Sequence, residues 1–294
     1  MSAAPPPDEF FVDARLVRRA FDRSAATFDA SAAVHSEIRT RLLERLDVVR
    51  LQPQTILDLG AGTGHGSRAL QERYSRALVV ALDLSRQMLV QARRQQRWLR
   101  PFARVVGDAH RLPIHDATVD MVFSNLMLQW SSDPDALFAE ARRVMRPEGL
   151  ITFATLGPDS LKEIRGAWSQ VDRHTHVHRF IDMHDLGDAL IRTGFAEPVM
   201  DAERLTITYA DPHSLFSELR ATGSVSLSLG RRHGLLGRSS AESFRTAHAQ
   251  TREDGRWPLT LEVVYGHAWT AQPRQRQAKG ESVVPFGQIG RRGK

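Results

Sequence analysis

A glycine-rich bend that begins with an acidic residue is the first feature of this sequence able to do chemistry. The segment Asp58–Gly64 reads Asp-Leu-Gly-Ala-Gly-Thr-Gly and follows an apolar run. Glycines let a backbone turn tightly and approach a ligand, because no Cβ stands in the way. A second carboxylate, Asp83, ends the next apolar run about twenty residues further on, where such folds place the acid that binds ribose hydroxyls. These residues favour a nucleotide or nucleoside site over a bend without a ligand.

The acid at the start of the bend helps to choose between two kinds of ligand. The pattern is Asp-x-Gly-x-Gly-x-Gly, whereas dinucleotide sites have Gly-x-Gly-x-x-Gly. A carboxylate beside the bend would repel a pyrophosphate, but it would attract the ammonium or sulfonium group of S-adenosylmethionine. We therefore expect S-adenosylmethionine here, with a dinucleotide as the alternative.

Two later segments are placed to complete such a site. Gly107-Asp108-Ala109 follows the next apolar run. An Asp there can accept a hydrogen bond from the amino group of an adenine, although a simple turn is the commoner role. Ser124 and Asn125 end the following run, at the edge where ligands bind in open α/β sheets, and the alternative for them is a helix cap.

Strands and helices must alternate to bring these segments together, and the sequence predicts that they do. Apolar residues recur at helical spacing over 12–49, and short apolar runs then alternate with helical patterns, which indicates βαβ units and a parallel sheet. The predicted strands are 55–59, 77–82, 104–106, 119–124, 150–155, 204–209 and 260–269. The predicted helices after residue 50 are 67–73, 85–97, 135–145, 160–171, 183–192, 214–221 and 239–250.

We therefore predict an α/β fold with a doubly wound, Rossmann-like, mostly parallel seven-stranded sheet. Helices are expected at the N-terminus, and a helical insertion or lid in the C-terminal half. Four parts are expected along the chain: a helical segment over the active site at 1–50, a cofactor-binding core at 51–156, a substrate or lid region with the last strands at 157–271, and a basic disordered tail at 272–294.

Composition narrows the class of protein. The chain of 294 residues has no cysteine, which excludes disulfides and thiolate nucleophiles. No apolar run reaches the roughly 20 residues that span a bilayer, and the first residues lack a signal pattern, so we expect a cytoplasmic protein. The net charge of +6 favours an acidic partner. The alternative is that the excess arginines simply lie on solvent-exposed faces. His174, His176 and His178 are spaced by two, which suits a strand and not one face of a helix. No set of other metal-ligating residues surrounds them, so we expect no metal site.

In combination, the motifs between about 51 and 155 resemble those of the class I methyltransferases. The matching segments are 58–64, Asp83, 107–109, 120–125 and 143–149. In such a site the bend flanks the methionine part of the cofactor, Asp83 holds the ribose, Leu84 and Met88 pack on the adenine, and Asp108 reads the adenine edge. The cofactor-binding residues that this resemblance implies are Asp58, Gly60, Ala61, Gly62, Asp83, Leu84, Met88, Asp108, Ala109, Ser124 and Asn125.

Segments outside the cofactor half resemble the malonyl-acyl-carrier-protein methyltransferases of biotin synthesis, the BioC family, over about 17–269. They are VRRAFDRSAATFD at 17–29, SNLMLQW at 124–130, TLGPDSL at 155–161, HVHRF at 176–180 and WPLT at 257–260. The resemblance implies methylation of the free carboxylate of a malonyl thioester on an acyl carrier protein. That reaction needs no general base, because a carboxylate is ionised at neutral pH. The chain departs from the family at Phe28, where a Tyr is usual.

Two residues are expected to serve the acceptor. Arg179 would hold the malonyl carboxylate in a bidentate contact, unless it pairs with a surface acid, and Gln129 would line the pocket. Trp130 would line it too or pack in the core. The carrier protein would dock on Arg18, Arg19, Arg231, Arg232 and Arg238, or these arginines lie on solvated faces. We expect a monomer with no nucleic-acid and no membrane partner.

Other functions fit the same fold. A small-molecule methyltransferase, for example one that acts on a quinone ring carbon, would need a base and no carrier-protein surface. A methyltransferase-fold assembly factor would bind a protein partner, and residues 157–161 and 182–194 resemble the mitochondrial respiratory-complex assembly factor related to this family, which hydroxylates an arginine. A nucleic-acid methyltransferase would suit the positive charge, but no RNA-binding appendage is evident.

Overall fold

A sheet of seven strands organises the protein, whose computed structural model describes residues 11–224, 227 and 237–271. The strand order is β3-β2-β1-β4-β5-β7-β6. Neighbours from β3 to β5 pair in parallel, whereas β7 is antiparallel to both β5 and β6. The strands are β1 (Thr55–Leu59), β2 (Leu78–Asp83), β3 (Ala103–Val106), β4 (Val119–Asn125), β5 (Met145–Leu156), β6 (Phe195–Tyr209) and β7 (Trp257–Thr270). This architecture confirms the predicted fold class.

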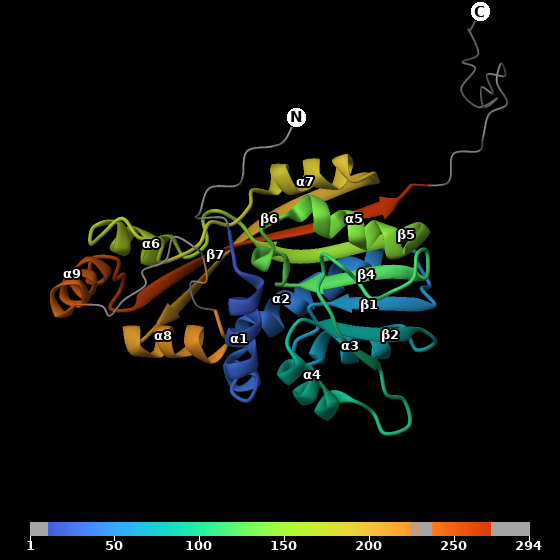
Figure 1. The fold of residues 1–294 in the computed structure, drawn as a ribbon. Helices are drawn as coiled ribbons and strands as arrows, with labels where there is room; N and C mark the ends of the chain where they lie inside the picture. The colour runs from blue at the N-terminus through green and yellow to red at the C-terminus, as the bar shows by residue number, and fades with distance from the viewer. Residues whose placement is uncertain (1–10, 225–226, 228–236, 272–294) are drawn as a thin grey trace, which may run out of the picture.

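Helices cover both faces of the sheet (Figure 1). They are α1 (Ala14–Ser24), α2 (Ala33–Glu44), α3 (His65–Arg73), α4 (Arg86–Ala92), α5 (Pro134–Val144), α6 (Lys162–Ser169), α7 (Met183–Arg192), α8 (Pro212–Ala221) and α9 (Arg238–Ala249). None of the helices within the described residues is long and apolar enough to cross a bilayer. Residues 272–294, expected to be a basic tail, lie outside the described part.

Alternating side chains along the central strands build two cores, one on each face. Ile56 and Phe123 belong to the core under α2, α3 and α4, whereas their neighbours Leu57 and Val122 belong to the core under α5 and α7. Successive strand side chains point to opposite faces, so a strand buried on both faces must be apolar throughout. This requirement explains why the central strands were easy to find in the sequence.

Strand β6 is much longer than the predicted 204–209. The sequence did not reveal its first part, because polar residues on the outward face interrupt the apolar pattern. Along β6 partly buried and exposed side chains alternate, as expected for an edge strand with one solvated face. On that strand, Glu203 pairs with Arg41 of α2 at 2.6 Å, and Asp201 pairs with Arg45 just after α2 at 2.7 Å. These charged residues of β6 therefore form ion pairs between the sheet edge and α2 with the turn that follows it.

Candidate active site

The glycine bend turns between β1 and α3 with its backbone in the left-handed region. Gly60, Gly62 and Gly64 have φ of +76°, +54° and +85°, which other residues rarely adopt. A Cβ on Gly60 would lie 2.4 Å from the Cγ of Met127, so that glycine is also needed for packing. A Cβ on Gly62 would meet nothing within 4 Å. Gly62 therefore borders open space that a ligand can enter.

Asp83 is held against the bend at the end of β2. Its Oδ2 accepts a hydrogen bond of 2.8 Å from the backbone N–H of Gly62, and its Oδ1 one of 2.7 Å from that of Ser85. Burial raises the pKa of Asp83 to about 6, although these bonds oppose the shift. Each carboxylate oxygen can accept a further bond, which suits a pair of hydroxyl donors.

Asp58 lies beneath the bend, where only 2% of its surface is exposed. The Ser67 hydroxyl donates a 2.6 Å hydrogen bond to its Oδ2. Burial raises the pKa of Asp58 to about 7, against the hydrogen bond from Ser67, and the nearby Asp83 raises it further. A buried and a partly buried carboxylate at one bend form a site that a cationic ligand would stabilise.

A cofactor-sized cavity opens at this edge of the sheet. It consists of two adjoining parts of about 120 and 260 Å³, which share Phe28, His35, Gly60, Gly62 and Asn125. Most of the residues expected to bind cofactor line it, namely Asp58, Gly60, Ala61, Gly62, Asp83, Leu84, Met88, Asp108, Ala109 and Asn125. We call this space the cofactor cavity.

Ser124 is the expected cofactor residue that the structure does not bring to this cavity. Its side chain is buried, and its Oγ donates a 2.8 Å hydrogen bond to the carbonyl of Leu59. The bond joins the ends of β4 and β1. Ser124 therefore supports the strands that carry the site, and its neighbour Asn125 faces the ligand space.

The N-terminal segment closes the cofactor cavity through two aspartates that the sequence did not single out. Asp22, in α1, accepts a 2.7 Å hydrogen bond from the hydroxyl of Ser85. Asp29 accepts one of 2.6 Å from the hydroxyl of Thr63, within the bend. An Asp in a helical pattern gives no sign of such a distant partner, so only the fold reveals these contacts.

Two residues that line the cofactor cavity each have a buried polar atom with no hydrogen-bond partner in the described part of the chain. These atoms are the Oδ1 of Asn125 and the Nδ1 of His35. The amide nitrogen of Asn125 is used, since it donates a 3.1 Å bond to the His35 carbonyl. Unpaired buried polar atoms are costly, and an acceptor near two carboxylates fits a ligand that brings an ammonium group. The residues present therefore fit S-adenosylmethionine.

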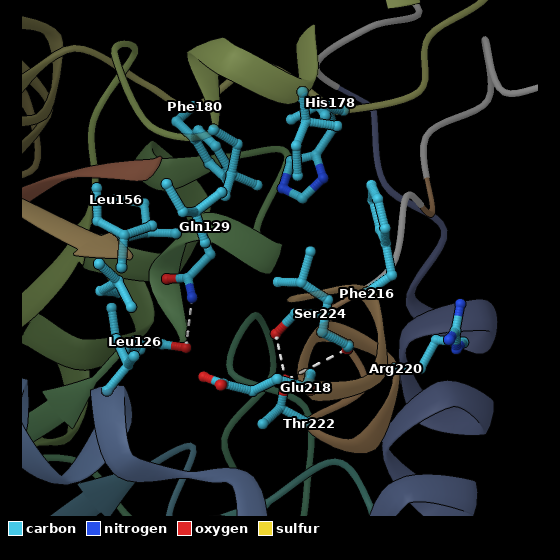
Figure 2. Close-up of a pocket in the computed structure, with 18 of the residues that line it drawn as sticks. Leu126, Gln129, Leu156, His178, Phe180, Phe216, Glu218, Arg220, Thr222 and Ser224 are labelled. Carbon is cyan, nitrogen blue, oxygen red and sulfur yellow. Dashed lines mark hydrogen bonds between the residues drawn. The ribbon is translucent and has the colours of Figure 1, made fainter. Parts of the chain in front are cut away.

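A second, larger cavity adjoins the first. It has a volume of about 400 Å³ and mostly apolar walls from α6, α8, β6, β7, residues 176–178 and Phe180 (Figure 2). It shares His35, Leu126 and Trp130 with the cofactor cavity, so these residues mark where the two spaces meet. We call it the acceptor cavity. Its polar lining includes Gln129, His178, Tyr209, Glu218 and Arg220, of which the last three gave no signal in the sequence.

Gln129 lines the acceptor cavity as expected, but Arg179 does not. The Nε2 of Gln129 donates a 2.7 Å bond to the carbonyl of Leu126. His178 and Phe180 are buried, with 5% and 4% of their surface exposed, whereas Arg179 between them is exposed. Arg179 borders a neighbouring cavity of about 210 Å³, which shares Gln129 and Phe180 with the acceptor cavity. Arg179 is not among the residues that line the acceptor cavity, although its neighbours His178 and Phe180 are. The expected carboxylate contact of Arg179 therefore has no geometric support.

Comparison with known proteins places this site in a family. Residues 57–153 match a family model described as a methyltransferase domain. Over 95% of its length, the chain is 46% identical to the malonyl-[acyl-carrier protein] O-methyltransferase of Laribacter hongkongensis, covering 97% of that protein. This chain belongs to the malonyl-[acyl-carrier protein] O-methyltransferase family. The member from Methylovorus sp. is also 46% identical, over 95% of this chain and 96% of its own.

A solved structure shows the same fold at greater distance. Phosphoethanolamine N-methyltransferase 2 of Haemonchus contortus, solved with S-adenosyl-L-methionine, has a TM-score of 0.52. It is 18% identical, over 85% of this chain and 57% of that one. At that identity the likeness concerns the fold alone. The family assignment of this chain therefore depends on the malonyl-[acyl-carrier protein] O-methyltransferases.

Asp58→Asn should stabilise the ligand-free protein at pH 8. Because burial raises the pKa of Asp58 from 3.8 to about 7, wild type loses stability as the pH rises through that range, and the variant does not. We expect a gain on the order of 2–4 kcal/mol in the free energy of unfolding, measured with urea.

Asp120→Asn is the matched control, and it should change the free energy of unfolding at pH 8 in the opposite direction. Burial raises the pKa of Asp120, but hydrogen bonds from Arg146 and from the N–H groups of Thr55 and Gln54 outweigh it, so the pKa is lowered overall. That carboxylate therefore contributes stability above its unfolded pKa, which its amide variant should lose at pH 8. An Asp58→Asn protein less stable than wild type at pH 8 would contradict the account.

Proposed function

We propose that this protein transfers the methyl group of S-adenosylmethionine to the free carboxylate of a malonyl thioester on an acyl carrier protein. The product, a malonyl methyl ester, would prime pimeloyl and biotin synthesis. The observation that carries the proposal is the meeting of two cavities at His35, Leu126 and Trp130. One has the carboxylates and glycines that suit a cationic nucleoside, and the other is deep and mostly apolar. The names of the close relatives support this acceptor.

Different residues of the cofactor cavity bind different parts of the nucleoside. When bound, S-adenosylmethionine supplies an electrophilic methyl group. Asp83 accepts the ribose hydroxyls, while Asp58 and the Oδ1 of Asn125 favour the cationic amino-acid part. Met88 is buried beside the space for the adenine, and Asp108 borders the same space.

The acceptor cavity supports the reaction mainly by alignment and by excluding water. A malonyl carboxylate is already a nucleophile at neutral pH, so the protein needs to supply no base. Opposite charges disappear in the transition state, and a dry cavity wall favours that loss of charge. Holding the reactants on either side of one opening also turns their encounter into an intramolecular event.

An arginine-rich face of α1 suits an acidic carrier protein. Arg15, Arg18, Arg19 and Arg23 are exposed on this helix, and none forms an ion pair within the described residues. Arg18 also borders the cofactor cavity. Arg238 is exposed at the start of α9, and the expected pair Arg231–Arg232 lies outside the described residues. Unpaired charges near a site mouth raise the rate of encounter with an acidic partner.

One observation favours a small-molecule methyltransferase as the second candidate. Glu218 lines the acceptor cavity, and burial raises its pKa despite a hydrogen bond with Tyr209. A carboxylate with a raised pKa is suited to act as a general base, which a ring-carbon acceptor would require. A malonyl carboxylate would leave this base without a role.

An acceptor assay with Asp83→Ala tests the proposal. Wild type should methylate malonyl-acyl carrier protein in preference to free dicarboxylic acids and quinone precursors. The variant should lose activity, because the ribose hydroxyls lose their acceptor. It should also fail to complement a biotin-requiring strain blocked at the methylation step. Preferred turnover of a quinone precursor by wild type would favour the second candidate, and full activity of Asp83→Ala would refute the cofactor assignment.

Arg19→Glu should impair the reaction only when the acceptor is protein-bound. Reversing one exposed charge on α1 weakens the electrostatic attraction of an acidic carrier, so KM for malonyl-acyl carrier protein should rise several-fold. The rise should be larger at low salt, where charges are screened less. Turnover of malonyl-pantetheine should stay unchanged. Arg50→Glu, at an exposed position just before β1, is the control and should change neither value. Equal effects of both variants would refute docking at α1.

A further inference from the structure

His178 has a ring nitrogen in the acceptor cavity that the fold leaves unused. Its ring lies between Trp130 and Phe180, with centroid distances of 5.1 and 4.7 Å, and points into the cavity (Figure 2). The ring is hydrogen bonded to the backbone of Gln129. Its Nε2 is buried and has no hydrogen-bond partner among the residues that the structure describes. Buried polar atoms in native proteins are nearly always paired, so an unpaired one on a cavity wall indicates a ligand contact.

We propose that the Nε2 of His178 binds one oxygen of the acceptor carboxylate, and that one proton enters the site with that carboxylate. This inference rests on the proposed function. A neutral imidazole that donates from one nitrogen to a carbonyl presents a lone pair at the other. A lone pair and a carboxylate repel each other, so the contact requires a proton between Nε2 and oxygen. His178 thus takes the place that the sequence suggested for Arg179.

The surroundings keep His178 neutral until an anion arrives. Burial lowers the pKa of His178 to about 4, against the bond to Gln129, and the positive Arg165 lowers it further. Arg165 itself is held by the carbonyls of Pro158 and Ser160, each at 2.9 Å. A carboxylate within hydrogen-bond distance reverses this balance, because an opposite charge favours the protonated ring.

Other titratable or charged groups also line the acceptor cavity, and one of them competes for the proton. They are His35, His176, Tyr209, Glu218 and Arg220. His176 is stacked on Trp168 at 3.6 Å and paired with Asp172 at 2.9 Å. Burial lowers the pKa of His35 to about 4, and His35 lines the cofactor cavity as well as the acceptor cavity. Glu218 is the competitor, since burial raises its pKa, and an added anion would raise it further.

The proton is borrowed and is not consumed by the reaction. Methyl transfer forms a bond between the second carboxylate oxygen and the methyl carbon, and the carbon–sulfur bond breaks with its electron pair left on sulfur. The ester that results is uncharged, so the pKa of His178 falls again and the proton returns to solvent. Substrate binding therefore strengthens as the pH falls, and weakens as the pH rises through the pKa of the occupied site.

Calorimetry of malonyl-pantetheine binding tests this assignment. The full-length protein with S-adenosylhomocysteine is titrated in buffers of different ionisation enthalpy, which measures proton uptake. Wild type should take up as much as one proton near neutral pH. His178→Gln places an amide N–H near the same position, so it should bind within about tenfold of wild type but with no uptake and no pH dependence. His178→Asn should lose the uptake in the same way.

Glu218→Gln is the matched control and should keep the uptake of wild type. Uptake that persists in both His178 variants, or that disappears only in Glu218→Gln, would overturn the assignment. Wild type that methylates malonyl-acyl carrier protein yet binds malonyl-pantetheine without proton uptake would overturn this inference alone. Wild type that neither binds nor methylates the malonyl thioester would overturn the proposed function as well.

Discussion

Two neighbouring carboxylates at a glycine bend, one buried and one partly buried, are the constraint on which the rest of the structure depends. Burial raises the pKa of both Asp58 and Asp83, so the fold holds them at a cost when no cation is present. The parallel pairing of β1 with β2 sets Leu59 opposite Leu82, which brings both acids to one edge. Asp22 and Asp29 then fasten the N-terminal segment over the bend. A site so arranged accepts a cationic nucleoside and discourages an anionic one.

The cofactor half was predictable because its signals are local. A glycine at positive φ, an acid at a strand end and an apolar strand buried on both faces each leave a mark within a few residues of sequence. Parallel strands then place their carboxyl ends at one edge, so Asp58, Asp83 and Asn125 converge without further information. Ser124 shows the limit of this reasoning. It ends the same strand as Asn125, but its side chain points away from the cavity and joins β4 to β1.

The acceptor half was less predictable, because its walls are assembled from distant segments. Arg179 was the obvious charged candidate in its segment, yet packing of His178 against Trp130 decides which side chain faces inward. Glu218 belongs to a helix whose pattern indicated only an amphipathic helix. The first part of β6 was not predicted as a strand, and its charged residues pair with Arg41 and Arg45, more than 150 residues earlier in the chain. In each case the deciding contact joins residues far apart in the chain.

A crystal structure of the protein with S-adenosylmethionine is the most direct measurement of the central claim. We expect the ribose on Asp83, the ammonium group near Asp58 and Asn125, and the methyl group directed toward the opening beside Trp130. A nucleoside bound elsewhere, or one whose methyl group faces away from the acceptor cavity, would contradict that claim.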